Sequence, residues 1–165
     1  MTTFATLWSN HPHVTHEVPL LDVRVYENQC AINLSASLLR SGVDMTSFKG
    51  QWSWQKDKPK YAIRAQELAD WLSVAGAAVP TRRELHAGAE AFGEVKGKSG
   101  IKNRAGIVFF QNYWGPGAQG DHIDLWNGSR LTDLASLVRI YVRVGSFGLG
   151  TDYRKAKSVW FFPVA

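Results

Sequence analysis

The residue that most directly suggests chemistry is Cys30, the only cysteine of the chain. A cysteine thiolate is a nucleophile, and hydrolases pair it with a histidine that accepts and returns the proton. A histidine suited to this role is His122, in the segment Gly-Asp-His-Ile-Asp-Leu-Trp-Asn-Gly at residues 120–128. This pair of residue types predicts that Cys30 is a nucleophile and that His122 is its base. The alternative is that Cys30 is a buried, unreactive apolar residue, the usual state of a lone cysteine.

The residues around Cys30 predict that it lies in the first turn of a helix. Apolar residues recur at helical spacing over residues 31–39. Asn28 is suited to cap the start of this helix, and Gly42 is suited to end it. The unpaired N–H groups and the positive dipole end of a first turn favour a thiolate, so we expect the pKa of Cys30 to lie below its usual ~8.5. The same N–H groups could hold an oxyanion.

The segment around His122 predicts a strand, because apolar and acidic residues interleave over residues 121–126. A base of this kind needs a third group that fixes its tautomer. Asp124 is one candidate, since it projects from the same face of the strand. Asp133 is the other, and it follows the Asn127-Gly128 turn signal. The spacing leaves both candidates open.

Metal binding is a weaker interpretation of the histidines. His11, His13 and His16 cluster near the amino terminus, but no cysteine or firmly placed carboxylate completes a ligand set. We interpret them as an incidental surface cluster. His122 and Asp124 could also be metal ligands, with Cys30, Asp121 or Asp133 as the third. We expect neither a metal nor another cofactor.

Composition predicts one globular domain spanning residues 1–165, because 45% of the residues are hydrophobic and seven are tryptophans. No window approaches the ~20 apolar residues of a membrane span, and the amino terminus lacks the pattern of a signal peptide. We therefore expect a soluble protein without a cleaved signal. One cysteine excludes an intramolecular disulfide.

The net charge of +5 favours an anionic partner. Lysines over residues 56–60 lie next to Trp52, Trp54 and Tyr61, a mixture that could bind nucleic acid. Because no recognised nucleic-acid motif accompanies it, a solvated loop beside core aromatic residues is the better interpretation.

The remaining pattern indicates an α+β protein in which the Cys30 helix packs on a mostly antiparallel sheet. A second helix is predicted over residues 62–73, and a capping-box pattern at Thr81 allows a third. Strands are predicted over residues 106–114 and 158–162. The first of these should pair with the His122 strand, with the loop at residues 115–120 at the mouth of a cleft.

Four segments of the chain, in this order, together resemble those of the fourth family of type VI secretion amidase effectors. They are Glu27–Ile32, Arg64–Ala69, Gly106–Trp114 and Gly120–Gly128. The resemblance runs from about Phe4 to Phe162, although residues 13–24 and 134–157 match loosely. It implies a papain-like, NlpC-type fold.

The same resemblance implies a peptidoglycan amidase that cuts the γ-D-glutamyl to meso-diaminopimelate bond of stem peptides. Carried over by position, the nucleophile is Cys30, the base is His122 and the third residue is Asp133, with Asp124 in reserve. The oxyanion would be held by the backbone N–H of Cys30 and by the Gln29 side chain.

The implied partners are the stem peptide, the type VI secretion machinery and a cognate immunity protein that plugs the cleft. Residues 93–104 and 115–120 are our candidates for its contact loops. The enzyme would be made in the producer's cytoplasm and act in the periplasm of a rival cell. The alternatives are another cysteine hydrolase or deamidase, or a non-catalytic module that binds the wall or nucleic acid.

Overall fold

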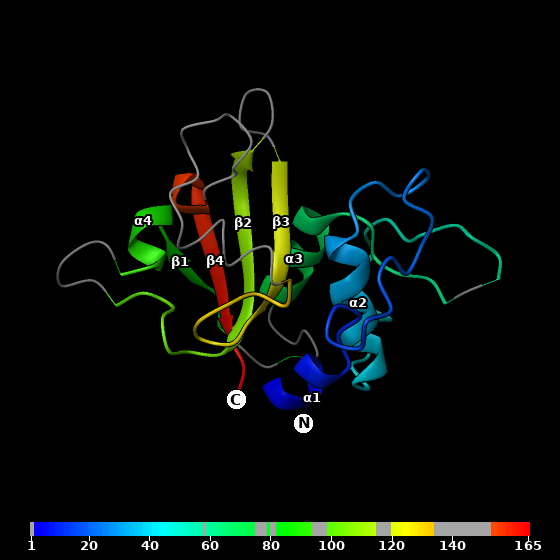
Figure 1. The fold of residues 1–165 in the computed structure, drawn as a ribbon, viewed down its shortest axis with the longest axis horizontal. Helices are drawn as coiled ribbons and strands as arrows, with labels where there is room; N and C mark the ends of the chain where they lie inside the picture. The colour runs from blue at the N-terminus through cyan, green and yellow to red at the C-terminus, as the bar shows by residue number, and fades with distance from the viewer. Residues whose placement is uncertain are drawn as a thin grey trace.

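The computed structural model describes residues 2–57, 59–74, 79, 82–93, 99–114, 120–133 and 153–165. The helical elements of this part are α1 (Phe4–Ser9), α2 (Cys30–Arg40), α3 (Ala65–Ser73), α4 (Gly88–Ala91) and the 3₁₀ turn η1 (Tyr153–Lys155). The strands are β1 (Glu84–His86), β2 (Gly106–Trp114), β3 (Gly120–Trp126) and β4 (Ser158–Pro163). Helices α2 and α3 lie beside β3, while α4 lies beyond the other side of the sheet (Figure 1). None of the helices in this part of the chain has the length and apolar character that crossing a membrane requires.

The four strands form one antiparallel sheet in the order β1-β4-β2-β3, which leaves β3 at an edge. The predicted pairing of β2 with β3 is confirmed, with Phe109 opposite Ile123 and Phe110 opposite His122. The third helix suggested by the capping-box pattern at Thr81 is wrong. Thr81 lies outside the described residues, but Glu84–His86 is a strand paired with β4, a distant segment that a four-residue pattern cannot detect.

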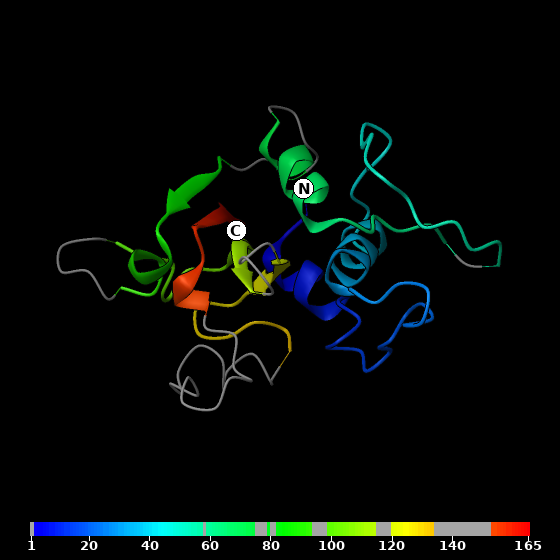
Figure 2. The ribbon, with the colours of Figure 1, turned by 90° about the horizontal axis from the view of Figure 1, so that it is seen from above.

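The sheet separates two apolar clusters because successive strand residues face opposite sides. Ile107, Phe109, Ile123 and Leu125 pack with buried residues of α2 and α3. Residues 108, 110 and 126 pack on the other face with α4 and η1. The view from above separates these layers, with α2 and α3 on one side of the strands and α4 and η1 on the other (Figure 2). The arrangement confirms the predicted α+β class.

Helix α2 is buried around its whole circumference over two turns, because residues 31–38 are all buried. Its end agrees with the prediction: Gly42 has a φ of +78°, and the N–H groups of Gly42 and Val43 donate to Leu39 and Leu38. These two bonds form a Schellman motif, which satisfies the last carbonyl groups of the helix. Its start differs by one residue, since the N-cap position is Gln29 and not Asn28.

Helix α3 begins three residues later than predicted, because Ala62 pairs with Trp52 in a short bridge instead of joining the helix. The unpredicted helix α1 packs beside α2, where the Ser37 hydroxyl donates to the carbonyl of Leu7. Its first residue, Phe4, donates its N–H to the carbonyl of Ala165, so the two ends of the chain lie together.

Candidate active site

Cys30 is the first residue of α2 and lies against the outer edge of β3. Its sulfur is within hydrogen-bonding reach of the backbone N–H of Ile123, as well as those of Ala31 and Cys30 itself. Because β3 is an edge strand, the N–H groups of Ile123 and Leu125 are free to point away from β2. One reaches the Cys30 sulfur, and the other donates to the Asp124 carboxylate at 2.7 Å.

Burial raises the pKa of the Cys30 thiol, and the negative charge of Asp124 adds to this effect. The three backbone N–H groups lower the pKa but do not outweigh desolvation. The expectation of a lowered pKa, based on the helix start alone, was therefore wrong. A resting thiol of this kind needs a base to remove its proton during attack.

His122 lies on β3 and is partly exposed, with 20% of its side-chain surface accessible. Its ring stacks on Phe110 at a centroid distance of 6.4 Å and lies 5.6 Å from the ring of Tyr153. These aromatic neighbours limit rotation of the imidazole. Its Nε2 atom lies 4.0 Å from Oδ2 of Asp124.

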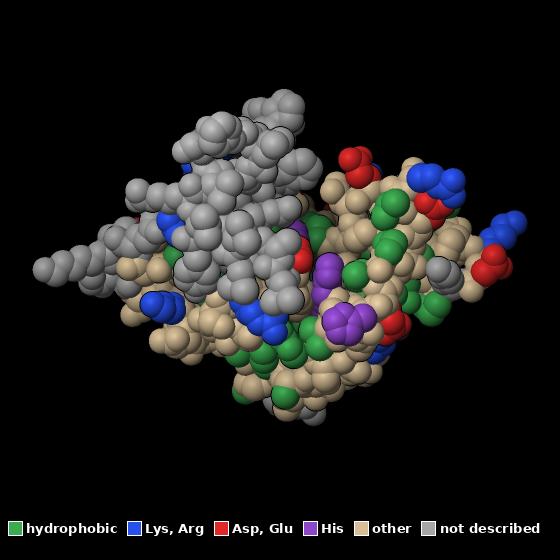
Figure 3. Space-filling view, viewed as in Figure 1, with side chains coloured by type: hydrophobic (Ala, Val, Ile, Leu, Met, Phe, Trp, Pro, Cys, Tyr) green, Lys and Arg blue, Asp and Glu red, His purple; other side chains and the backbone are tan. Residues whose placement is uncertain are grey.

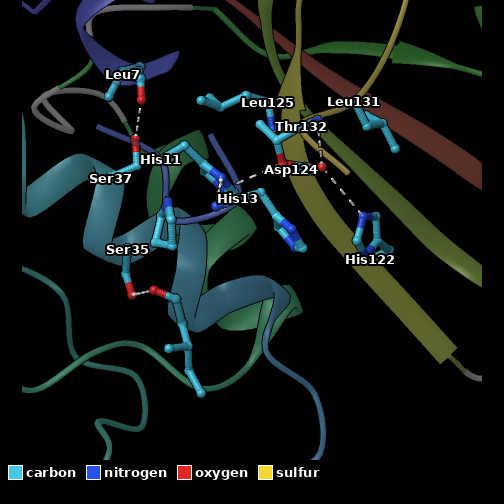
Figure 4. A network of polar contacts seen from close by, with 12 residues as sticks. Leu7, His11, His13, Ser35, Ser37, His122, Asp124, Leu125, Leu131 and Thr132 are labelled. Atoms are coloured by element: carbon cyan, nitrogen blue, oxygen red, sulfur yellow. Dashed lines mark hydrogen bonds and ion pairs between the residues drawn. The ribbon is translucent and has the colours of Figure 1, made fainter. Parts of the chain in front are cut away.

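Asp124 is buried, and its carboxylate accepts three short hydrogen bonds. Oδ1 accepts from the hydroxyl of Thr132 at 2.6 Å and from the N–H of Leu125, while Oδ2 accepts from the N–H of Thr132 at 3.1 Å. Burial raises the pKa of Asp124 to about 7, and the three hydrogen bonds oppose that shift by favouring the charged form. Figure 4 shows this carboxylate at the centre of a polar network.

Asp133, the other candidate for the third residue, is half-buried after the turn that follows β3. Its negative charge raises the pKa values of both His13 and Asp124, so it lies near these two groups. The structure therefore brings Cys30, both aspartates and the strand histidine to one region. The role of each remains a prediction.

Gln29, expected to help hold an oxyanion, uses its side chain to brace the preceding loop. Its Nε2 donates to the carbonyls of Tyr26 at 2.6 Å and Leu21 at 3.3 Å, and its Oε1 accepts from the N–H of Leu21. Gln29 would have to release one of these carbonyls to donate to an oxyanion.

A cavity of about 310 Å³ adjoins that loop, and the ring of Trp54 lies 4.6 Å from the ring of Tyr26 at its side. The lining residues are Leu21, Asp22, Val25, Tyr26, Trp54, Gln55 and Asp57. Trp54 is 57% exposed, whereas Tyr61 is buried. The aromatic residues beside the lysine-rich loop thus belong partly to the core, as the sequence suggested.

Sequence reasoning missed His11, which was expected to lie in a surface cluster. His11 is 1% exposed, and its Nε2 lies 3.5 Å from Oδ1 of Asp124. His16 is exposed and His13 is half-buried, so the expectation was wrong for His11. Nothing local signals this role, because the partner of His11 lies far downstream. Histidine side chains gather near the middle of one face, with an acidic side chain among them (Figure 3).

Within the described ranges, no group of three or more His, Cys, Asp or Glu side chains is arranged to hold a metal ion. The site contains groups of the kind that acyl transfer uses. It holds a thiol at a helix start, backbone N–H donors beside it, and an imidazole next to a buried carboxylate.

The sequence model of one protein family matches residues 26–162 of the chain. That family is described as Type VI secretion system (T6SS), amidase effector protein 4, or Tae4. Among curated proteins, no sequence matches the chain.

Solved structures share its fold. A chain in the crystal structure of the type VI effector–immunity complex Tae4–Tai4 from Enterobacter cloacae is 20% identical, with a TM-score of 0.65 and coverage of 100% of this chain and 99% of that one. A chain of the Tae4/Tai4 effector–immunity system from Salmonella typhimurium is 15% identical, with a TM-score of 0.64 and the same coverage. Tae4 from Enterobacter cloacae alone is 18% identical, with a TM-score of 0.62 and coverage of 100% and 98%. The fold is papain-like and of the NlpC type, as predicted.

Proposed function

Because the chain belongs to the type VI secretion system amidase effector protein 4 family, we propose that it hydrolyses the γ-D-glutamyl to meso-diaminopimelate bond of peptidoglycan stem peptides. Membership makes the chain an amidase effector, a hydrolase that acts as a cell-wall-degrading antibacterial toxin. The choice of bond follows from the family resemblance, and the cysteine mechanism rests on one observation. The thiol of Cys30 lies at the start of α2 against the edge of β3, the strand that carries His122.

The proposed reaction is acyl transfer in two steps. His122 removes the proton of the Cys30 thiol as the sulfur attacks the γ-carbonyl carbon of D-glutamate. The tetrahedral oxyanion is held by the backbone N–H of Cys30, with Gln29 as a second donor once it releases a carbonyl. His122 then gives the proton to the departing amine of diaminopimelate, which leaves a thioester.

The second step restores the enzyme. His122 removes a proton from water, the hydroxide attacks the thioester carbonyl, and the sulfur leaves as a thiolate that regains its proton from His122. The raised pKa of Cys30 supports a thiol, not a preformed thiolate, as the resting state. Proton transfer to His122 is thus part of the attack.

We assign the third catalytic position to Asp133, as the family resemblance implies, and keep Asp124 as the alternative. Asp133 supplies negative charge to the region of His13 and Asp124. Asp124 is supported by its 4.0 Å approach to the Nε2 of His122. A carboxylate in this position would orient the ring and stabilise the imidazolium.

The proposed setting follows from the same family. The solved relatives include effector–immunity complexes, which supports a cognate immunity protein that covers the cleft of this chain. Its candidate contact loops are residues 93–104 and 115–120. Residues 94–98 of the first loop and 115–119 of the second lie outside the described part. We further propose that residues 1–165 form one domain, which the type VI machinery delivers to the periplasm of a rival cell. The net charge of +5 would favour the anionic wall.

The test is mass spectrometry of diaminopimelate-type peptidoglycan fragments incubated with the wild-type protein and with Cys30→Ala. We expect new termini at D-glutamate and diaminopimelate with the wild type alone. Cleavage at a different amide would establish another cysteine hydrolase or deamidase. Binding without cleavage by a folded wild type would indicate a non-catalytic wall-binding module.

A further inference from the structure

The cavity of about 310 Å³ near the start of α2 lies outside the proposed mechanism, and most of its walls are apolar. Leu21 and Tyr26 are buried there, whereas Val25 is 52% exposed and Trp54 is 57% exposed. Small-molecule sites in proteins are concave and are lined mainly by apolar and aromatic side chains with a few polar groups. The cavity therefore has the size and the lining of a small ligand site.

Trp54 is held in place by its neighbours although its ring is exposed. Its backbone N–H donates to the hydroxyl of Tyr26 at 2.9 Å, and the two rings lie 4.6 Å apart at an angle of 48°. The hydroxyl of Tyr26 donates to Oε1 of Gln55 at 3.4 Å, and Nε2 of Gln55 donates to the carbonyl of Pro59 at 2.6 Å. An indole that is already fixed loses little conformational freedom when a ligand covers it.

The charged groups at the cavity favour an uncharged ligand. The described lining contains two carboxylates, Asp22 and Asp57, and neither Lys nor Arg. Arg24 pairs with Asp22 at 2.7 Å, and this hydrogen bond lowers the pKa of Asp22 to about 2, so the group stays charged. Such a lining would repel the carboxylates of a stem peptide. Hydroxyl and amide N–H groups could instead donate to it.

The cavity wall is fastened to the residue that precedes Cys30. Gln29 donates its side-chain N–H to the carbonyls of Tyr26 and Leu21, both of which line the cavity. Tyr26 and Cys30 are four residues apart, so their Cα atoms lie within roughly 14 Å of each other. Residues 21–26 and 54–57 lie on the side of α2 that faces away from β3 (Figures 1 and 2).

This distance matches a part of peptidoglycan that the proposed reaction does not alter. Two amino acids and a lactyl group separate the γ-D-glutamyl bond from N-acetylmuramic acid, the sugar that carries the stem peptide. They span roughly 10 Å when extended. A sugar in the cavity and the scissile bond at Cys30 are therefore compatible with one continuous substrate.

We propose that this cavity is a subsite for the N-acetylated sugar that carries the stem peptide. The inference rests on the proposed function, which supplies the substrate. The C–H face of the sugar ring covers the indole of Trp54, and the acetamido methyl group enters the apolar space beside Leu21 and Val25. Sugar hydroxyl groups donate to Asp57. D-glutamate then lies at Cys30, and diaminopimelate departs on the side away from the cavity.

The first test measures sugar binding without any cleavage. The probe is N-acetylglucosaminyl-N-acetylmuramoyl-L-alanine amide, which is uncharged and has no scissile bond. It is titrated into ¹⁵N-labelled wild-type protein, and the indole N–H signal of Trp54 is assigned by its absence in Trp54→Phe. We expect a saturable shift of this signal, and none with N-acetyl-L-alanine amide. No shift, or a shift that does not saturate, would overturn the proposal.

The second test compares two substrates with the same scissile bond. One is N-acetylmuramoyl-L-alanyl-γ-D-glutamyl-diaminopimelate, and in the other an acetyl group replaces the muramoyl sugar. We expect the wild-type kcat/KM to be about tenfold higher for the first, through KM, because the sugar contacts lie far from the reacting atoms. Trp54→Ala should remove this advantage without changing kcat/KM for the acetyl peptide. Trp54→Phe keeps an aromatic face and should retain part of it.

The matched control is Leu85→Ala, which truncates another large exposed side chain, on β1 and outside the cavity. It should keep the full sugar advantage. Equal losses on both substrates in Trp54→Ala, with circular dichroism as the check of folding, would show a structural role and reject the subsite.

Two further outcomes are distinguishable. If Trp54→Ala keeps the sugar advantage but weakens binding of the cognate immunity protein, the surface belongs to that protein and the proposal is wrong. If the wild type cuts neither substrate, the proposed function fails, while the sugar titration still decides whether the cavity binds the sugar.

Discussion

The two sides of the site are held by different forces. The α2 side carries Cys30 on a helix whose next eight residues are buried among apolar side chains and whose end is closed by backbone bonds at Gly42. The β3 side carries His122 beside a buried carboxylate that accepts hydrogen bonds from Thr132 and Leu125 and lies 3.5 Å from Nε2 of His11. Packing therefore places the proposed nucleophile, whereas a buried polar network lies beside the proposed base. Damage to the first should reduce stability, and damage to the second should reduce catalysis.

Asp133→Asn is the substitution that we expect to separate loss of catalysis from loss of stability most strongly. We expect kcat to fall about 10²- to 10⁴-fold with little change in unfolding temperature, because the amide cannot stabilise the imidazolium of His122. Steady-state cleavage of the peptidoglycan fragment measures this loss. Asp44→Asn, at an exposed position, is the control and should behave as the wild type.

Asp124→Asn sharpens the same comparison. Its amide NH₂ would meet the N–H donors of Leu125 or Thr132, so this variant should lose stability as well as activity. An active Asp133→Asn together with an inactive, folded Asp124→Asn would move the third catalytic position to Asp124.

Acid should reveal the cost of burying His11. Its pKa falls from 6.5 unfolded to about 3 folded, so the unfolded chain binds the proton more tightly, and lowering the pH from 6.5 to 4 removes about 3 kcal/mol of stability. Asp124, with a pKa raised to about 7, has the opposite sign: the folded state binds its proton more tightly, and stability rises as the pH falls from 7 toward 4.

The two groups therefore offset each other in the wild type, and His11→Leu removes one of them. We expect urea unfolding to show His11→Leu gaining about 3 kcal/mol relative to the wild type between pH 6.5 and pH 4. A stability difference that stays constant over this range would contradict the buried, neutral state of His11. His16→Asn serves as the exposed control.

On the α2 side, Leu34→Ala should cost about 3 kcal/mol of unfolding free energy, because Leu34 is fully buried and leaves a cavity. The folded fraction should keep a near-wild-type kcat, since the polar network is untouched. Urea unfolding and active-fraction titration measure the two quantities. Leu85→Ala is the control, because Leu85 is 60% exposed and should change stability by less than about 0.5 kcal/mol.

The smallest expected effect is that of Gly42→Ala, about 1 kcal/mol. A Cβ at this position meets nothing within 4 Å, so the cost arises from the φ of +78° and not from a clash. Gly42→Asn should cost less, because asparagine tolerates this conformation. Equal unfolding temperatures for Gly42→Ala and the wild type would show that the C-terminal motif does not hold α2.

Local signals explain which parts of the fold were predictable. The hairpin of β2 and β3 follows from apolar periodicity around the Gly-rich loop, and the end of α2 follows from Gly42. The strand at Glu84–His86 could not be predicted because it exists through pairing with β4.

The same distinction applies to the site. The places of Cys30 at a helix start and of His122 on a strand could be predicted from local patterns, and the structure confirms both places. The raised pKa of Cys30 depends on burial against β3, and the contact of His11 with Asp124 joins segments far apart in the chain. Both depend on tertiary contacts, which cannot be predicted from the spacing of residues within one segment.

The most direct test of the central claim uses the single thiol of the chain. Wild-type protein is treated with iodoacetamide at mildly alkaline pH, and intact-protein mass spectrometry gives the alkylated fraction while cleavage of the peptidoglycan fragment gives the remaining activity. If Cys30 is the nucleophile, activity falls in proportion to alkylation and reaches zero when every molecule carries one adduct. Fully alkylated, folded protein that still cuts the fragment would contradict the account.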